Sequence, residues 1–303
     1  MKKLLFIVNP CSGKGKIRTR ILDILDIFIK AGYDVKVHIT QRSLDAREAV
    51  IKKGKRADLI VCSGGDGTLN ETVSGIMELK NPPVLGYIPS GSTNDYGTSL
   101  RIPKNMIQAA QIAVRGDLYM ADVGMFCGER YFVYIAGFGA FTEVSYITPQ
   151  DKKNLLGHQA YVMEAVKNLS PLKSSHMKVC WEQEDGSIRE MEGDFIFGMV
   201  TNAVSVGGFK GLVKGNVVLN DGIFEGLFIH MPKTPMDFSN IVSYLLIRDE
   251  EENECVKRIR ARRIECHSSE PVDWTLDGEF GGTKTDVVIE NLQERIGIHS
   301  LHK

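Results

Sequence analysis

The chain has 303 residues, of which 43% are hydrophobic, and a formal net charge of −1. This length accommodates two domains with sizeable cores, and the absence of a basic excess excludes a generic nucleic-acid partner. The six cysteines are scattered, without a CxxC pair or clustered histidines, which favours reduced thiols in a cytoplasmic protein over a disulfide framework or a zinc site. The apolar run at residues 4–8 is too short for a signal core or a spanning helix, so we expect no transmembrane segment.

Short apolar runs alternate with helical patterns over the first third of the chain. Strands are predicted at residues 3–8, 33–40, 59–62 and 84–88, and helices at about 17–31, 43–53, 69–77 and 106–115. This alternation is typical of an open, mainly parallel α/β sheet.

Three glycine-rich loops, at residues 9–16, 63–68 and 89–95, each follow a predicted strand. Because ligands of such sheets bind at the carboxyl ends of the strands, we expect the loops to converge on one edge. The second loop, SGGDGT, lies between a strand and a helix, where free N–H groups and a helix dipole favour a phosphate chain. Its three glycines allow the backbone to reach positive φ and allow a ligand to approach without interference from a Cβ. Asp66 is interpreted as a ligand of Mg²⁺ or of a substrate hydroxyl; the alternative is a helix-capping Asp on an ordinary turn.

The second half of the chain is rich in strand patterns. Strands are predicted at residues 120–126, 130–136, 177–182, 194–202, 217–219, 222–230, 263–266, 272–276 and 285–290, and helices at 156–168 and 236–246. A run of strands after a run of βα units indicates a second, β-rich domain that begins near Met125.

Two carboxylates, Asp277 and Glu279, flank Gly278 at the end of a predicted strand. They are compatible with a hairpin that turns at Asp-Gly. They are equally compatible with one carboxylate acting as a general base. The chemistry alone leaves both interpretations open.

The motifs NPCSGKGK, SGGDGTLNE, IPSGSTND and LDGEFGG, in this order, resemble those of the soluble bacterial diacylglycerol-kinase-like lipid kinases. These belong to a superfamily with diacylglycerol, sphingosine and ceramide kinases and, more distantly, NAD kinases and phosphofructokinases. The resemblance covers essentially the whole chain. It implies an N-terminal α/β ATP-binding domain at residues 1–124, joined again by about 291–303, a β-sandwich-like domain at 125–290, and an active site in the cleft between them.

The resemblance also implies roles for individual residues. It assigns ATP contacts to Asn9, Pro10, Cys11, Ser12, Gly13, Thr40, Gly64, Gly65, Asp66, Gly67, Thr68, Leu69, Asn70, Glu71, Ser92 and Asn94. It places Asp66, Asp95 and Asp122 around the catalytic Mg²⁺, and a further Mg²⁺ at Asp221 with backbone carbonyls near Val218 and Ile223. Glu279 takes the position of the proton acceptor, with Asp277 as its competitor. Ser92 replaces the family's usual Thr, and the stretch before Asp221 lacks the family's proline.

The expected reaction is the ATP- and Mg²⁺-dependent phosphorylation of a lipid hydroxyl, with diacylglycerol as the leading acceptor and phosphatidic acid as its product. Such an acceptor is reached peripherally, at the inner face of the membrane, and a homodimer is compatible with a β-rich domain. Two alternatives stay open: a kinase of a soluble acceptor such as NAD, and a nucleotide-binding regulator without turnover.

Overall fold

The computed structural model describes residues 1–139, 173–207, 209–210, 217–247 and 253–301. The chain divides into two compact units, which we describe separately. Unit 1 comprises Met1–Tyr134, Asn202–Ile223 and Asn291–Lys303, and unit 2 comprises Ile135–Thr201 and Phe224–Glu290. The helix predicted at 156–168 lies outside the described residues.

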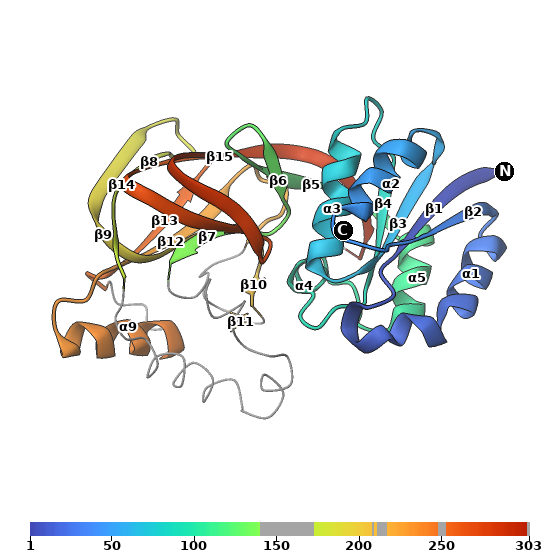
Figure 1. The fold of residues 1–303 in the computed structure, drawn as a ribbon, viewed down its shortest axis with the longest axis horizontal. Helices are drawn as coiled ribbons and strands as arrows, with labels where there is room; N and C mark the ends of the chain where they lie inside the picture. The colour runs from blue at the N-terminus through green and yellow to red at the C-terminus, as the bar shows by residue number, and fades with distance from the viewer. Residues whose placement is uncertain (140–172, 208, 211–216, 248–252, 302–303) are drawn as a thin grey trace. The chain divides into compact units, whose positions relative to one another are not determined.

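Unit 1 is built on a parallel sheet whose strands run in the order β2, β1, β3, β4 (Figure 1). The end of β15 adds to β4, with Ile298 opposite Leu85, and β5 pairs with β15 and with β6. These strands are β1 (Lys2–Val8), β2 (Tyr33–Ile39), β3 (Leu59–Gly64), β4 (Val84–Pro89), β5 (Asp117–Phe126), β6 (Arg130–Phe132) and β15 (Glu279–Ser300).

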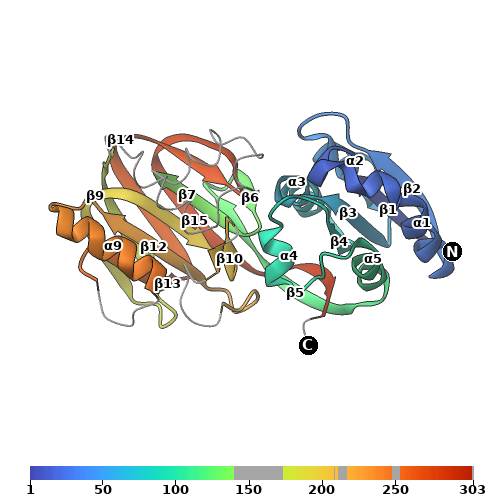
Figure 2. The same cartoon turned by 90° about the horizontal axis from the view of Figure 1, so that it is seen from below.

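Helices cover both faces of this sheet, α2 with α3 on one side and α1 with α5 on the other (Figure 2). The helices of unit 1 are the 3₁₀ helices η1 (Ser12–Thr19) and η2 (Gly54–Arg56), and the α-helices α1 (Ile21–Lys30), α2 (Asp45–Lys53), α3 (Asp66–Met77), α4 (Asp95–Ser99) and α5 (Met106–Arg115). The helix predicted at 17–31 is thus divided, since Arg20, at φ −119°, separates η1 from α1.

The core of unit 1 follows from the continuous apolar runs of its strands. All residues from Leu4 to Val8 are buried, as expected for a parallel strand covered on both faces. Phe6 meets Phe28 of α1 edge-on, with ring centroids 5.2 Å apart. The prediction of an α/β sheet in the N-terminal part of the chain is confirmed.

Unit 2 is β-rich and antiparallel, with strands in the order β13, β12, β9, β7, β14, β15 and with β8 paired to β9 and β14. Its elements are β7 (Ile135–Gly139), β8 (Ser175–Glu182), β9 (Ile188–Thr201), β12 (Phe224–His230), α9 (Pro235–Ile247), β13 (Val256–Ala261), β14 (Arg263–Leu276) and the first part of β15. Phe138 is central to its core, with ring centroids 4.9 Å from Trp274 and 6.4 Å from Phe228. The predicted β-rich second part is confirmed.

The division of the chain between the two units differs from the expected domain boundaries in one stretch. Residues Asn202–Ile223, with β10 (Ser205–Val206) and β11 (Phe209–Lys210), were expected in the second domain but group with unit 1. One cause is the backbone bond from the N–H of Asp122 to the carbonyl of Leu219, at 2.7 Å.

Two strand predictions also need correction. Residues 217–219 form no strand, and the strand predicted at 130–136 is two strands, β6 and β7, interrupted at Val133 and Tyr134. Within the described part of the chain, we find no helix with the length and apolar character that a membrane span requires.

Candidate functional site

The three glycine-rich loops of unit 1 lie together at the carboxyl ends of β1, β3 and β4. The N–H of Asn9 donates to the carbonyl of Ser63 at 2.9 Å, and the N–H of Ser90 donates to the carbonyl of Gly64 at 2.9 Å. The loop after β3 is therefore bonded to both of the others.

Two close approaches explain glycines in these loops. Gly13 has φ +53°, and a Cβ there would collide with the carbonyl oxygen of Ser90. A Cβ on Gly91 would lie 2.5 Å from the Cα of Gly65. The backbones of the three loops pack directly on one another, and larger residues would force them apart.

The SGGDGT loop differs from its prediction. Of the two uses expected for Gly64, Gly65 and Gly67, positive φ is not adopted by any of them. Instead Gly65 is extended, at φ −86°, and the helix α3 begins at Asp66. The N–H groups of Gly67 and Thr68 lie in the first turn, where no carbonyl of the same helix precedes them. The element of this loop that could bind a phosphate is thus the N-terminus of a 12-residue helix and not a left-handed loop.

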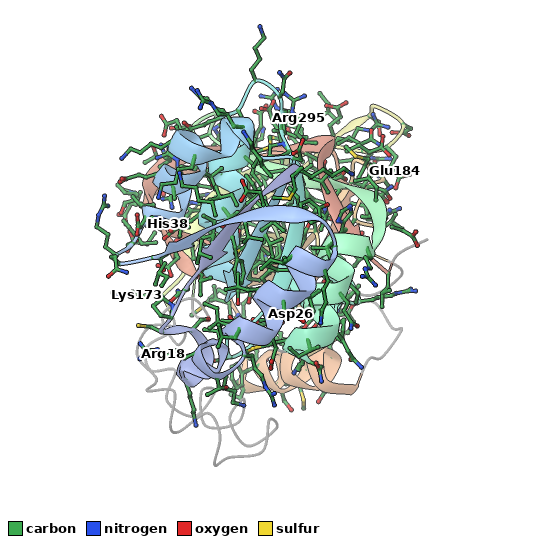
Figure 3. The ribbon with its side chains drawn as sticks, turned by 90° about the vertical axis from the view of Figure 1, so that its right-hand side faces the viewer. Arg18, Asp26, His38, Lys173, Glu184 and Arg295 are labelled. Carbon is green, nitrogen blue, oxygen red and sulfur yellow. The ribbon has the colours of Figure 1, made fainter. Side chains whose placement is uncertain are left out.

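Asn9 joins the first loop to this helix. Its Nδ2 donates to Oγ1 of Thr68 at 2.9 Å, and its Oδ1 accepts the N–H of Cys11 at 3.0 Å. Arg18, labelled in Figure 3, donates from Nε to the carbonyl of Pro10 at 3.2 Å. The NPCSG segment is therefore held in place by the side chain of Asn9 at its start and by that of Arg18, which follows it.

Asp66 and Asp95 are brought together by their hydrogen bonds. The carboxylate of Asp66 accepts the N–H of Asp95 at 3.2 Å and that of Tyr96 at 3.4 Å, so it caps α4 and not its own helix. Asp95 is almost fully buried, and its Oδ1 accepts the hydroxyl of Ser205 at 2.6 Å.

This pair fits the requirements of Mg²⁺, which takes hard oxygen ligands and is commonly held by one or two carboxylates together with phosphate oxygens and water. Among the residues that the structure describes, no group of three or more His, Cys, Asp or Glu could hold a metal by itself. A cation at Asp66 and Asp95 would therefore need the nucleotide to complete its coordination.

Asn94 closes the third loop upon itself. At φ +56° it adopts a left-handed conformation that Asn tolerates better than most residues. Its Oδ1 accepts the N–H of Gly91 and its Nδ2 donates to the carbonyl of Gly91, both at 2.8 Å. The hydroxyl of Tyr87 donates to the same Oδ1 at 3.4 Å. The amide of Asn94 thus shapes the loop, while the side chain of Ser92 at its tip is exposed.

Two residues expected to contact ATP have structural partners. Glu71 accepts the N–H groups of Leu44 at 2.8 Å and Ala46 at 3.1 Å, and so caps α2. Leu69 is fully buried, and its N–H donates to the carbonyl of Gly65 at 3.0 Å. Leu69 is therefore a core residue with no N–H donor left for a phosphate.

Three more residues expected to contact ATP are Asn70, Thr40 and Ser12. The Nδ2 of Asn70 donates to the carbonyl of Tyr131 at 3.0 Å, and the N–H of Thr40 donates to the carbonyl of Val8 at 2.9 Å. The hydroxyl of Ser12 lies 3.5 Å from the position of a Cβ on Gly65. Ser12 thus faces the loop that leads into α3.

Asp122 forms a second acidic centre with Asp221. Oδ1 of the buried Asp122 accepts the N–H of Glu294 at 2.7 Å, and Oδ2 accepts that of Gly222 at 2.8 Å. Burial raises the pKa of Asp122, and these two N–H donors partly offset the rise. Both oxygens are thus engaged by backbone, which makes Asp122 a clamp for this segment of unit 1.

Asp221 occupies the turn that follows. Its Oδ1 accepts the N–H of Ile223 at 3.0 Å. A carboxylate with neighbouring carbonyls supplies the hard oxygen donors that Mg²⁺ prefers, so the residues around Asp221, Val218 and Ile223 fit the expected second metal in chemistry.

The structure separates the roles of Asp277 and Glu279 in unit 2. Asp277 at φ +50° and Gly278 at φ +85° are the two central residues of the hairpin between β14 and β15, in which Leu276 pairs with Glu279. Positive φ at both positions defines a type I′ turn. The buried carboxylate of Asp277 accepts the N–H of Ile135 at 3.0 Å, whereas the side chain of Glu279 is exposed. The hairpin interpretation therefore holds for Asp277.

Ser205 is a residue of the described site that the sequence did not single out. It belongs to no motif and contacts Asp95 from 110 positions further along the chain. No local pattern could have identified it.

An α/β unit with glycine-rich loops at its strand ends, a helix N-terminus, and Asp66 bonded to the backbone of Asp95 is typical of the class of proteins that bind phosphates, and its carboxylates could hold a divalent cation. The comparisons with known proteins narrow this class. Residues 3–126 match the family model described as the diacylglycerol kinase catalytic domain.

Curated relatives match nearly the whole chain. It is 34% identical over 284 residues to a diacylglycerol kinase of Bacillus subtilis (strain 168), covering 93% of this chain and 91% of the relative. It is 32% identical over 298 residues to a diacylglycerol kinase of Staphylococcus aureus (strain bovine RF122 / ET3-1), covering 98% and 92%.

Solved structures show the same fold. A crystal structure of a diacylglycerol kinase from Bacillus anthracis str. Sterne aligns with a TM-score of 0.76 at 23% identity, over 99% of this chain and 97% of that chain. Another structure from that organism aligns with a TM-score of 0.82 at 25% identity, over 99% and 95%. The chain belongs to the diacylglycerol kinase catalytic-domain family.

Proposed function

We propose that this protein transfers the γ-phosphoryl group of ATP, with Mg²⁺, to the hydroxyl of a lipid alcohol, and that diacylglycerol is its acceptor. The observation that carries the proposal is the 34% identity with a diacylglycerol kinase over 93% of this chain and 91% of the relative. Since diacylglycerol resides in membranes, the enzyme would meet it at a membrane surface.

The nucleotide site would be the junction of the three loops. The first-turn N–H groups of α3, at Gly67 and Thr68, would donate to phosphate oxygens, and the helix dipole favours negative charge at the same point. Asn9 and Ser12 would support the phosphates from the first loop. Phosphoryl transfer asks a protein mainly for such positioning and charge stabilisation.

Asp66 and Asp95 would hold Mg²⁺, which would neutralise the negative charge that develops on the phosphates during transfer. Asp66 is suited to this role because the N–H groups at the start of α4 fix its carboxylate. Loss of such a ligand is expected to lower the rate by about 10²–10⁴-fold.

Glu279 would accept the proton of the attacking hydroxyl. Its side chain is exposed, whereas that of Asp277 is buried and bonded to the backbone of Ile135. The acceptor oxygen forms the new bond to γ-phosphorus as its proton passes to Glu279. The bond from γ-phosphorus to the bridging oxygen breaks, and ADP leaves.

Radiolabelled ATP with Mg²⁺, offered with mixed micelles of diacylglycerol and in parallel with NAD, tests this proposal. Label in phosphatidic acid is the expected result, with loss of turnover in Asp66→Ala and retention of its fold by circular dichroism. Asp26→Ala, a change at an exposed carboxylate of α1, is the matched control and should keep wild-type activity. Label in the NAD product alone, tight ATP binding without transfer, or near-normal activity in Asp66→Ala would overturn the assignment.

A further inference from the structure

The hydroxyl of Ser205 holds the carboxylate of Asp95. Its Oγ lies 2.6 Å from Oδ1 of Asp95, and the two residues are only 3% and 2% exposed. A hydrogen bond from a hydroxyl to an ionised carboxylate is short and about twice as strong as a neutral one. In this buried setting it fixes the orientation of the Asp95 side chain.

A second hydroxyl, that of Ser99, ties the same segment to α4 through backbone groups. The N–H of Val204 donates to Oγ of Ser99 at 3.1 Å, and Oγ of Ser99 donates to the backbone carbonyl of Asp95 at 3.2 Å. Residues 204 and 205 are therefore attached to α4 at two points; Val204 bonds the hydroxyl of Ser99, and Ser205 bonds the carboxylate of Asp95. This difference allows attachment of the segment to be tested separately from orientation of the carboxylate.

Asp95 also contacts Asp66, because its backbone N–H donates to Oδ2 of Asp66 at 3.2 Å. Ser205 therefore stands at the start of a series of contacts that passes through Asp95 to Asp66. These are the two carboxylates that fit a divalent cation.

We propose that Ser205 is a positioning residue for the Mg²⁺ site: it holds Asp95 in the orientation in which that carboxylate binds the cation of the Mg·ATP complex. The inference rests on the proposed function for its nucleotide and metal. Carboxylates that bind metals are themselves hydrogen-bonded, and loss of such a partner typically lowers metal affinity or activity by about 10–100-fold.

The experiment compares Ser205→Ala, Ser205→Thr and Ser99→Ala in the full chain. A fluorescent ATP analogue is bound at fixed concentration while Mg²⁺ is titrated, and the Tm of each variant is measured without nucleotide. Ser205→Ala is expected to need about 10–100-fold more Mg²⁺ for half-maximal binding. Ser205→Thr keeps a hydroxyl and should restore the wild-type requirement. Ser99→Ala should also show the wild-type requirement, although it loses the other attachment point.

Three outcomes would contradict the inference. The first is an unchanged Mg²⁺ requirement in Ser205→Ala. The second is an equal shift in Ser99→Ala, which would mean that attachment of the segment matters and not orientation of the carboxylate. The third is a Ser205→Thr variant that folds like the wild type but keeps the raised requirement. Nucleotide binding by the wild type that does not depend on Mg²⁺ would instead overturn the proposed metal role, and this inference with it.

Discussion

Asp277 and Glu279 lie two positions apart, yet the structure predicts opposite consequences for their replacement. Asp277 shapes the type I′ turn and bonds the backbone of Ile135, whereas the exposed Glu279 would act in the reaction. Changes at Asp277 should therefore affect stability, and changes at Glu279 should affect turnover.

The magnitude for Asp277→Ala follows from two losses. The N–H of Ile135, which is part-buried, loses its acceptor, which costs about 1–3 kcal/mol. A residue with a Cβ and no polar side chain at φ +50° adds about 1–2 kcal/mol. We therefore expect Asp277→Ala to lower the free energy of unfolding by about 2–5 kcal/mol.

Asp277→Asn is the milder change. Asn keeps a side-chain acceptor for Ile135 and tolerates left-handed φ, and Asn-Gly is favoured in a type I′ turn. Only the charge of the acceptor is lost, which costs about 1 kcal/mol. This variant should keep most of the wild-type kcat.

Glu279→Gln should leave the free energy of unfolding nearly unchanged, because no described contact of the fold depends on its exposed side chain. Loss of a general base lowers kcat by about 10²–10⁴-fold. Urea unfolding and initial rates of lipid phosphorylation, measured on the same preparations, provide both numbers for each variant.

The opposite pattern would refute this reasoning. If Asp277→Asn keeps wild-type stability but loses turnover, while Glu279→Gln keeps kcat, the base is Asp277. A wild-type free energy of unfolding in Asp277→Ala would show that the contact with Ile135 does not support the turn.

Three further predictions concern unit 1. Glu71→Ala should lower the free energy of unfolding by about 1–2 kcal/mol, because Leu44 and Ala46 lose the cap of α2; unchanged urea unfolding would contradict this. Asn202→Leu should keep stability or raise it by about 1–3 kcal/mol, because the buried amide of Asn202 has no hydrogen-bond partner among the described residues, and a lower Tm would show that it has one. Alkylation of the exposed thiol of Cys11 should be slower with Mg·ATP, with a Cys11→Ser variant to assign the label; equal rates with and without nucleotide would place ATP elsewhere.

Local sequence patterns were sufficient to determine most elements of unit 1. The apolar run at residues 59–62 predicted a buried strand, because a strand covered on both faces is continuously hydrophobic and the run is too short for a buried helix. The helix predicted at 106–115 is α5 with the same bounds. Its start is capped by Asn105, whose side chain accepts the N–H groups of Ile107 and Gln108.

The sequence by itself also located the loops that converge. Each loop follows a strand, and parallel strands deliver their carboxyl ends to one edge, so convergence follows from the order of elements alone. The backbone conformation of the loops could not be predicted from the sequence. Glycine can serve either positive φ or close approach, and only the packing of Gly65 against Gly91 showed which applies.

Tertiary structure decided what the polar side chains do. The sequence patterns identified Asp66 and Asp277 as functional candidates, and the family resemblance added Glu71 and Asn94; each of the four is now seen to hold backbone in place. The partner of a carboxylate is set by the folded path of the chain and not by neighbouring residues. Ser205 is the clearest case, since its bond to Asp95 spans 110 positions and exists only once β10 has been brought to α4.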